Sequence, residues 1–109
     1  MKYPTGVHVS DFPDEGKKKV SVKDKDILLV KYQDAFYAVD NRCPHMGGSL
    51  FDGTLDGHYI TCPKHGSVFN IKNGKFHQGG KLLMLKVKTS DLKSYPVSIE
   101  GDELRIEIE

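Results

Sequence analysis

Short runs of apolar and β-branched residues, broken at close intervals by glycine, proline and turn-forming pairs, set the pattern of this chain. Such spacing is typical of an all-β protein with short strands. Residues 10–16 carry a helix-start signal followed closely by a glycine stop, so they allow at most one helical turn. The pattern predicts strands over residues 5–9, 17–22, 27–32, 35–40, 58–61, 68–71, 82–87, 93–100 and 104–109.

Two of these segments indicate how the strands are buried. Residues 27–32 form a continuous apolar run, which is consistent with a buried strand. In residues 104–109 the apolar positions alternate with charged ones, as expected for a strand with one buried face. Gln33–Asp34 and Asn73–Gly74 are tight connections between apolar segments, and each predicts a hairpin turn.

The order of these segments favours an antiparallel β-sandwich or partial barrel. We expect residues 1–109 to form a single domain, because the chain contains no internal repeat, linker or low-complexity segment. Residues 41–77 are expected to form a smaller lobe at one end. This lobe contains two loops, at 43–47 and 62–66, that must face each other if they build one site.

Composition excludes several classes of protein. The chain has 109 residues, of which 38% are hydrophobic and 28% charged, and its formal net charge is +1. These values fit a folded protein and lack the basic excess of a nucleic-acid-binding one. No apolar run approaches the roughly 20 residues that span a bilayer, and residues 1–6 lack the apolar stretch of a signal peptide. We therefore expect a cytoplasmic protein with no membrane or nucleic-acid partner, whose two cysteines have a metal-binding or reactive role.

The two loops share one arrangement of metal-binding side chains. Cys43-Pro44-His45-Met46-Gly47 is answered by Cys62-Pro63-Lys64-His65-Gly66, with sixteen residues (46–61) between His45 and Cys62. Each loop thus offers one thiolate and one imidazole, followed by a glycine. Thiolates suit iron–sulfur clusters, whereas imidazole suits both iron and zinc.

This pattern resembles the Rieske proteins, in which two loops hold a [2Fe–2S] cluster with two cysteines on one iron and two histidines on the other. The resemblance extends over nearly the whole chain. It implies an all-β, Rieske-like fold with a cluster-binding lobe at one end. It also implies one [2Fe–2S] cluster, with Cys43, His45, Cys62 and His65 as the ligands.

Two other chemistries compete with this interpretation. A structural zinc site can also use two cysteines and two histidines. Zinc fingers, however, usually pair cysteine with cysteine and histidine with histidine, whereas each pair here contains one cysteine and one histidine. A Cys–His nucleophile is a weaker alternative, because it leaves the second, matching pair unexplained. His8, His58 and His77 are isolated in the sequence, and we expect surface or polar roles for them.

The sequence departs from high-potential Rieske relatives in ways that predict a low reduction potential. Those relatives carry two further cysteines that bridge the loops, where this chain has Gly48 and Lys64. They also have a serine after the second His-Gly and a tyrosine two residues later, whose hydroxyls donate hydrogen bonds toward the cluster sulfurs. Ser67 is retained here, but Phe69 has no hydroxyl. Since such bonds raise the potential, we expect a value near the bottom of the roughly −150 to +300 mV Rieske range.

The rest of the sequence offers no second functional site beside the paired loops. The chain has no G-x-G-x-x-G phosphate-binding loop and no motif for mononuclear iron. It resembles the free-standing Rieske ferredoxins that carry electrons from a flavin-dependent reductase to a terminal oxygenase, so we expect an electron carrier and not an enzyme. A small Rieske subunit of a nitrite reductase, or a zinc-stabilised interaction module, are the alternatives.

Overall fold

The computed structural model describes residues 1–12, 16–44, 48–63, 66–78 and 90–108, and within these ranges its regular secondary structure consists mostly of β-strands. Two short 3₁₀ turns, η1 (Val9–Asp11) and η2 (Leu50–Asp52), complete it. The predicted all-β class is therefore confirmed. The strands are β1 (Lys2–His8), β2 (Lys17–Val22), β3 (Lys25–Tyr32), β4 (Ala35–Asp40), β5 (Thr54–Asp56), β6 (Tyr59–Thr61), β7 (Val68–Asn70), β8 (Phe76–Gln78), β9 (Ser94–Tyr95), β10 (Val97–Glu100) and β11 (Glu103–Glu107).

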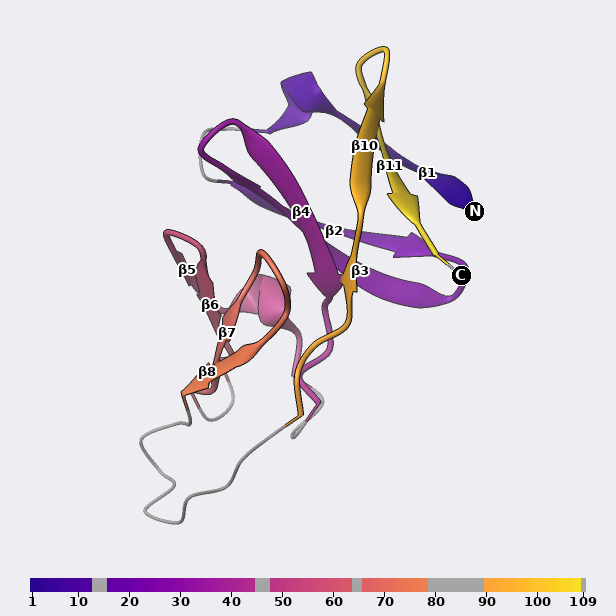
Figure 1. The fold of residues 1–109 in the computed structure, drawn as a ribbon. Helices are drawn as coiled ribbons and strands as arrows, with labels where there is room; N and C mark the ends of the chain where they lie inside the picture. Colours follow the sequence, from indigo (N-terminus) through magenta and orange to yellow (C-terminus); the bar gives the residue numbers. More distant parts are fainter. Residues whose placement is uncertain (13–15, 45–47, 64–65, 79–89, 109) are drawn as a thin grey trace.

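The strands form three antiparallel sheets (Figure 1). The first has the order β1-β11-β10, the second β2-β3-β4-β9 and the third β5-β6-β7-β8. The third sheet lies at one end of the molecule, away from the two chain termini, as Figure 1 shows. It coincides with much of the segment that the sequence predicts as a smaller lobe.

The second sheet is central, because apolar side chains cover both of its faces. Ile27 and Leu29 of β3 belong to one hydrophobic core, whereas Leu28 and Val30 belong to another. All four side chains are fully buried. Successive residues of a strand point to opposite faces, so burial on both sides explains why this segment is apolar throughout instead of alternating.

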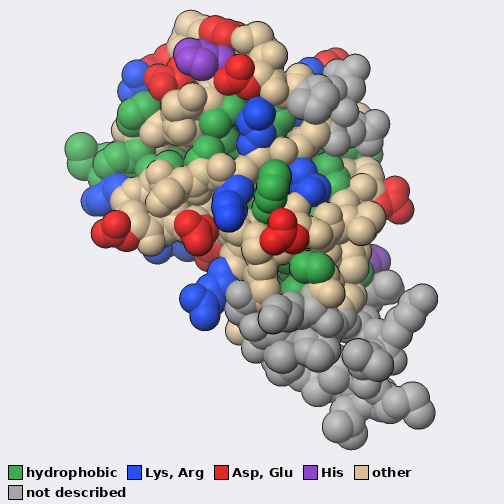
Figure 2. All heavy atoms as spheres, turned by 180° about the vertical axis from the view of Figure 1, so that it is seen from behind, with side chains coloured by type: hydrophobic (Ala, Val, Ile, Leu, Met, Phe, Trp, Pro, Cys, Tyr) green, Lys and Arg blue, Asp and Glu red, His purple; other side chains and the backbone are tan. Residues whose placement is uncertain are grey.

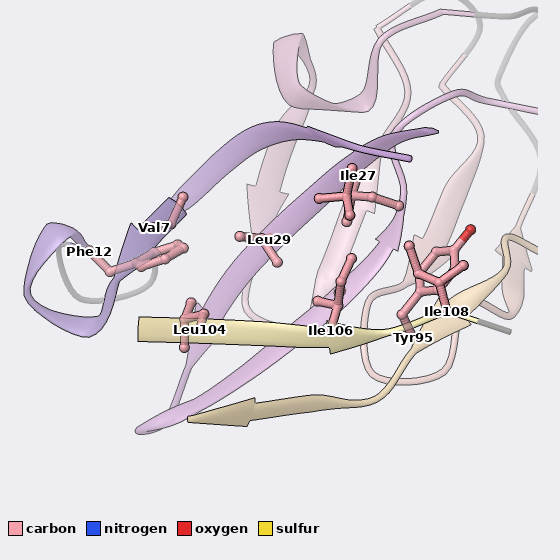
Figure 3. Packing of buried hydrophobic residues seen from close by; sticks show 10 residues of the cluster. Val7, Phe12, Ile27, Leu29, Tyr95, Leu104, Ile106 and Ile108 are labelled. Carbon is pink, nitrogen blue, oxygen red and sulfur yellow. The ribbon is translucent and has the colours of Figure 1, made fainter. Parts of the chain in front are cut away.

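The first core fills the space between the central sheet and the β1-β11-β10 sheet (Figure 3). Leu104, Ile106 and Ile108 supply one side of it, which confirms the alternation predicted for the last strand. Phe12 packs edge-to-face against Phe36, with 5.3 Å between the ring centroids. This core holds the scaffold together and includes neither cysteine.

The second core joins the other face of the central sheet to the β5–β8 sheet. Leu28, Val30 and Val39 lie on the central-sheet side, and Ile60 and Phe69 come from β6 and β7. Both cysteines are members of this core. The apolar contacts that attach the small sheet therefore also surround the two thiols.

Two hairpins of the central sheet use matching turns. Gln33 and Asp34 have φ angles of 49° and 63°, and they join β3 to β4 with Tyr32 opposite Ala35. Positive φ at both central residues is the twist that suits a two-residue hairpin loop. The turn predicted at Gln33–Asp34 is confirmed. Lys23 and Asp24, with φ angles of 49° and 64°, make an equivalent turn between β2 and β3 that the residue types do not signal.

Several predicted elements differ from the structure. The single strand expected over residues 93–100 is divided at Pro96: β9 pairs with β4, whereas β10 pairs with β11. Proline has no N–H to donate to a sheet, which favours a change of partner there. The glycines of residues 47–57 indicate turns and close backbone approach, and this segment also contains η2 and β5. The strand predicted over 82–87 lies outside the described residues.

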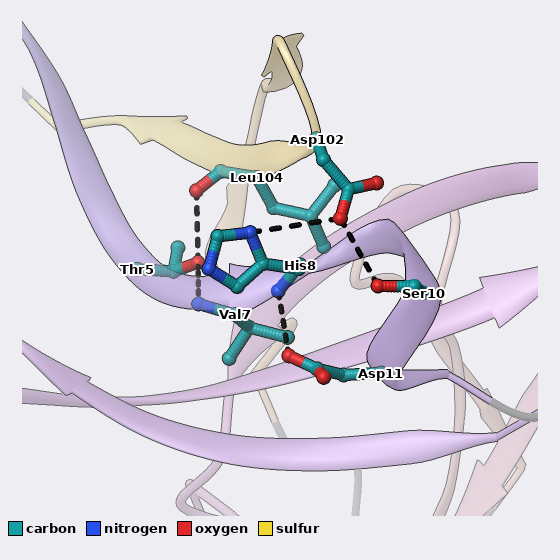
Figure 4. Close-up of polar contacts among 7 residues, drawn as sticks. All are labelled: Thr5, Val7, His8, Ser10, Asp11, Asp102 and Leu104. Carbon is teal, nitrogen blue, oxygen red and sulfur yellow. Dashed lines mark hydrogen bonds and ion pairs between the residues drawn. The ribbon is translucent and has the colours of Figure 1, made fainter.

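The chain ends meet on the side of the molecule occupied by the first sheet. The amino group of Met1 donates a hydrogen bond to the carbonyl of Ile108 over 3.2 Å. At the other end of β1, the backbone N–H of His8 donates to Asp11, and the Ser10 hydroxyl donates to Asp102 (Figure 4). His8 Nδ1 lies 3.7 Å from the Asp102 carboxylate, and both side chains are exposed. His8 thus has the surface polar role that the sequence predicts.

The described surface carries no dominant charge. On the face shown in Figure 2, Lys and Arg side chains are interspersed with Asp and Glu, in keeping with the formal net charge of +1. Within the described ranges, no helix has the length and apolar character that a membrane crossing requires.

A hydrogen bond between Tyr95 and Asp40 ties β9 to the end of β4. The Tyr95 hydroxyl donates to the Asp40 carboxylate over 2.6 Å, and the Asp40 N–H donates to the Lys93 carbonyl over 2.9 Å. Burial, together with the hydrogen bond to Asp40 and its negative charge, raises the pKa of Tyr95 far above its ordinary value of 10.0. The phenol is therefore neutral in the folded protein at every ordinary pH.

We predict that Tyr95→Phe lowers the free energy of unfolding by about 1–2 kcal/mol at pH 7, because the hydrogen bond is lost. Above about pH 10 the unfolded chain releases the Tyr95 proton while the folded chain retains it, so the original protein loses stability as pH rises. The stability gap to Tyr95→Phe should then shrink between pH 7 and pH 11 in denaturant unfolding. Tyr37→Phe, at a half-buried tyrosine of β4, is the control. A gap that is constant or widens contradicts the prediction.

Candidate metal centre

The two cysteines come from separate strands and reach the same core. Cys43 follows the end of β4 by three residues, and Cys62 directly follows β6. Each has about 1% of its surface exposed, and both belong to the second core. Two cysteine thiols in one apolar core are the kind of soft ligand that suits an iron–sulfur centre.

The two cysteine loops close in the same way. The N–H of Cys43 donates to the carbonyl of Gly48 over 2.9 Å, and the N–H of Cys62 donates to the carbonyl of Ser67 over 2.8 Å. In both loops the cysteine is therefore bonded to the residue five positions later. This equivalence reflects the sequence correspondence between the loops, and it gives each cysteine a fixed backbone.

His45 and His65 fall between these closing residues in the sequence but lie outside the described residues. Lys64 lies outside them as well. The structure thus places Cys43 and Cys62 in one core, and the role of all four side chains as ligands stays a prediction.

The flanks of the two loops are held by different means. The Cys62 loop connects β6 to β7, where Thr61 lies opposite Val68, so a β-ladder reaches the base of the loop on both sides. The Cys43 loop leaves β4 and returns into η2, and its base is closed by an isolated bridge between Arg42 and Ser49. The first loop therefore depends on local hydrogen bonds in place of an extended ladder.

Gly53 fixes the approach of one loop to the other. It caps η2, on the return side of the Cys43 loop, and it packs against Thr61, the residue before Cys62. A Cβ atom at Gly53 would lie 1.9 Å from the Thr61 carbonyl oxygen, which is shorter than any contact a side chain can make. Only glycine allows the two backbones to come this close.

Lys17 of β2 adds a contact from the central sheet to η2. Its ammonium group donates a hydrogen bond to the carbonyl of Phe51 and lies 4.5 Å from the centroid of the Phe51 ring. The sequence gives no sign of this role, because Lys17 stands first in a run of three lysines that otherwise suggests a solvated strand edge.

The remaining histidines are engaged elsewhere. The ring of Tyr59 lies between those of His58 and His77, with centroid distances of 4.2 and 4.4 Å. Across the described ranges, no group of three or more His, Cys, Asp or Glu side chains forms a further site for a metal ion. His77 is exposed, as expected for a surface residue, whereas His58 is half-buried and contacts aromatic rings.

Similarity to known proteins identifies the family of this chain. The profile of the family described as Rieske [2Fe–2S] domain matches residues 3–96 of this chain. The protein belongs to the Rieske [2Fe–2S] family. The predicted resemblance is confirmed, and with it the expectation of one [2Fe–2S] cluster. The donor set fits that cofactor, because the structure places two buried cysteines from matching loops in one core.

Individual Rieske relatives match over nearly their full length. The ferredoxin component of the naphthalene 1,2-dioxygenase/salicylate 5-hydroxylase systems of Ralstonia sp. is 33% identical over 101 residues, which cover 93% of this chain and 90% of the relative. A ferredoxin in a solved complex of reduced oxygenase and oxidized ferredoxin in carbazole 1,9a-dioxygenase is 26% identical, with a TM-score of 0.82 and coverage of 99% and 97%. The carbazole 1,9a-dioxygenase ferredoxin from Nocardioides aromaticivorans IC177, 19% identical with a TM-score of 0.85, covers 100% of this chain and 99% of its own and shares the fold.

We predict that Gly53→Ala separates the two cysteine loops, because the new methyl group collides with the Thr61 backbone. The expected loss is more than about 2 kcal/mol in free energy of unfolding, with a clear fall in iron content. Gly101→Ala is the control: Gly101 has φ of 64° and nothing within 4 Å of an added Cβ, so only backbone strain of roughly 1 kcal/mol applies. Denaturant unfolding and iron analysis measure both. Equal iron content in Gly53→Ala and Gly101→Ala would contradict the prediction.

Proposed function

We propose that this protein is a one-electron carrier, the ferredoxin component of an oxygenase system. The observation that carries the proposal is similarity over nearly the entire chain to the Ralstonia ferredoxin component and to a ferredoxin in complex with a carbazole dioxygenase oxygenase. Its partners are a flavin-dependent reductase, which supplies electrons, and a terminal oxygenase, which takes them. Only two cysteines, both buried in the core, are in keeping with work in the reducing cytoplasm.

The cluster ligands in this proposal are Cys43, His45, Cys62 and His65. When bound, the [2Fe–2S] cluster supplies a centre that accepts and donates one electron. Residues 1–109 act as one Rieske domain, and residues 41–77 form its cluster-binding lobe. Cys43 and Cys62 bind on the buried side, where Leu50, Ile60 and Phe69 exclude water.

The two alternative functions have less support. A nitrite reductase subunit shares the fold, but the relatives named above are components of dioxygenase systems. A zinc-stabilised module is disfavoured by the family match, because the matching profile is that of a [2Fe–2S] domain.

Ser67 and Phe69 support a low potential for this carrier. Ser67 is 3% exposed, and its carbonyl accepts the N–H of Cys62, so the two residues lie next to each other. Phe69 is fully buried in the core that holds both thiols, and it brings no hydroxyl to that core. An apolar surrounding with few donors disfavours the added negative charge of the reduced form.

We predict that the midpoint potential lies in the lower part of the roughly −150 to +300 mV Rieske range, and that Ser67→Ala lowers it further. If the hydroxyl contributes about 1.4 kcal/mol of differential stabilisation to the reduced form, the decrease is roughly 60 mV for this one-electron couple. Protein-film voltammetry measures both values. Ser21→Ala, at an exposed serine of β2, is the control and should leave the potential unchanged. A midpoint above about +100 mV contradicts this prediction.

The proposed function is tested by anaerobic reduction of the purified protein followed by mixing with an oxidised terminal oxygenase. We expect uptake of one electron per chain from a flavin reductase, and loss of that electron on addition of an oxygenase of the naphthalene 1,2-dioxygenase type. Cys62→Ser, which removes one proposed ligand, should take up none. A colourless, zinc-containing protein that accepts no electron would exclude the carrier, and copurification with a large reductase subunit would favour the nitrite reductase alternative.

A further inference from the structure

Asn41 is a buried polar residue at the base of the Cys43 loop. Among the described residues, Asn41 and Ser67 are the two polar side chains in the buried class, and Asn41 is 3% exposed. It stands between the last residue of β4 and the loop, two positions before Cys43. A buried amide is costly unless its donors and acceptors are bonded, so its contacts indicate what it does there.

The hydrogen bonds of Asn41 join it to the return side of the loop and to β3. Its side-chain oxygen accepts the N–H of Phe51 over 2.8 Å, and its side-chain nitrogen donates to the Ser49 hydroxyl over 2.9 Å. Its carbonyl accepts the N–H of Leu50 over 2.8 Å, and its own N–H donates to the carbonyl of Asp26 over 2.9 Å. One residue thus joins the outgoing side of the loop to three consecutive residues on the return side.

The hydrogen bonds of Asn41 take the place of the strand pairing that is found at the base of the Cys62 loop but not at the base of the Cys43 loop. At the base of the Cys62 loop, β6 and β7 are paired up to Thr61 and Val68. At the base of the Cys43 loop, the return side is the single 3₁₀ turn η2, which offers no strand for β4 to pair with. The Asn41 side chain instead supplies the acceptor and donor that a neighbouring strand would have supplied.

We propose that Asn41 is the positioning residue of the Cys43 loop, which fixes where Cys43 lies relative to Cys62. The Cys62 loop is held by its β-ladder and does not depend on Asn41. Residue 41 therefore acts on one half of the metal centre. The part of this inference that concerns the metal centre rests on the proposed function, whereas the part that concerns the loop does not.

Three variants and two controls separate this role from a general effect on folding. Asn41→Ala removes both side-chain hydrogen bonds and leaves the half-buried Phe51 N–H without its acceptor. Asn41→Asp keeps an acceptor for Phe51 but loses the donor to Ser49, and Ser49→Ala removes only the hydroxyl. Asn73→Ala is the matched control, because the Asn73 side chain also accepts a backbone N–H, that of Lys75, but is exposed. Ile106→Val is the second control, because it lowers the free energy of unfolding through the first core, which contains neither cysteine.

The first measurement is hydrogen–deuterium exchange by mass spectrometry on the purified protein as isolated. Loss of a buried hydrogen bond should speed exchange in peptides covering residues 49–53 about tenfold in Asn41→Ala, with a smaller change in Asn41→Asp and Ser49→Ala. Peptides covering residues 60–70 should be unchanged. Asn73→Ala should leave both regions unchanged, and Ile106→Val should not single out residues 49–53. Equal acceleration of both loops, or no acceleration, overturns the proposal.

The second measurement concerns the metal centre. In Asn41→Ala the g-values of the reduced protein should shift, and iron should be released to a chelator about tenfold faster than from the original protein. Ile106→Val should show neither the shift in g-values nor the faster release of iron, although its free energy of unfolding is comparable to that of Asn41→Ala. If exchange is localised to residues 49–53 but g-values and iron release are those of the original protein, Asn41 holds the loop without positioning the centre, and the proposal fails. If the original protein holds no iron, the proposed function fails instead, and the exchange result still decides the role of Asn41 in the loop.

Discussion

Burial of the central sheet on both faces is the constraint on which the rest of this structure depends. Ile27 and Leu29 pack into the scaffold core, whereas Leu28 and Val30 pack into the core that contains both cysteines. Since neighbouring residues of one strand serve the two cores, the small β5–β8 sheet is fixed against a rigid backbone. Cys43 and Cys62 are therefore part of the hydrophobic core and not an addition to its surface.

Within that frame, two loops of matching sequence are supported differently. Both close through a hydrogen bond from the cysteine N–H to a carbonyl five residues later. The Cys62 loop continues a β-ladder, the Cys43 loop rests on hydrogen bonds from Asn41, and Gly53 lets the two backbones meet. A site built from two separate loops needs such a contact, because metal ligands hold their geometry only as well as the backbone beneath them.

Much of this organisation could be predicted from local patterns. The strands at 17–22 and 35–40, the turn at Gln33–Asp34 and the paired cysteines follow from periodicity, turn chemistry and spacing. The division of the strand at Pro96 and the pairing of β9 with β4 could not, because they depend on which sheet a strand joins over long range. The roles of Asn41, Lys17 and Gly53 could not be predicted either, since each depends on a contact with a residue eight or more positions away in the sequence. A glycine-rich segment at 47–57 was the only local sign of the close approach at Gly53.

The central claim is that two thiols and two imidazoles, one of each from each loop, hold a [2Fe–2S] cluster. Pulsed electron paramagnetic resonance of the chemically reduced protein tests this most directly, because it detects nitrogen atoms bound to the paramagnetic centre. The account predicts couplings from two inequivalent imidazole nitrogens, with one lost on substitution of His45 and the other on substitution of His65. A reduced centre with no directly bound nitrogen, or a protein with no reducible iron, would contradict it.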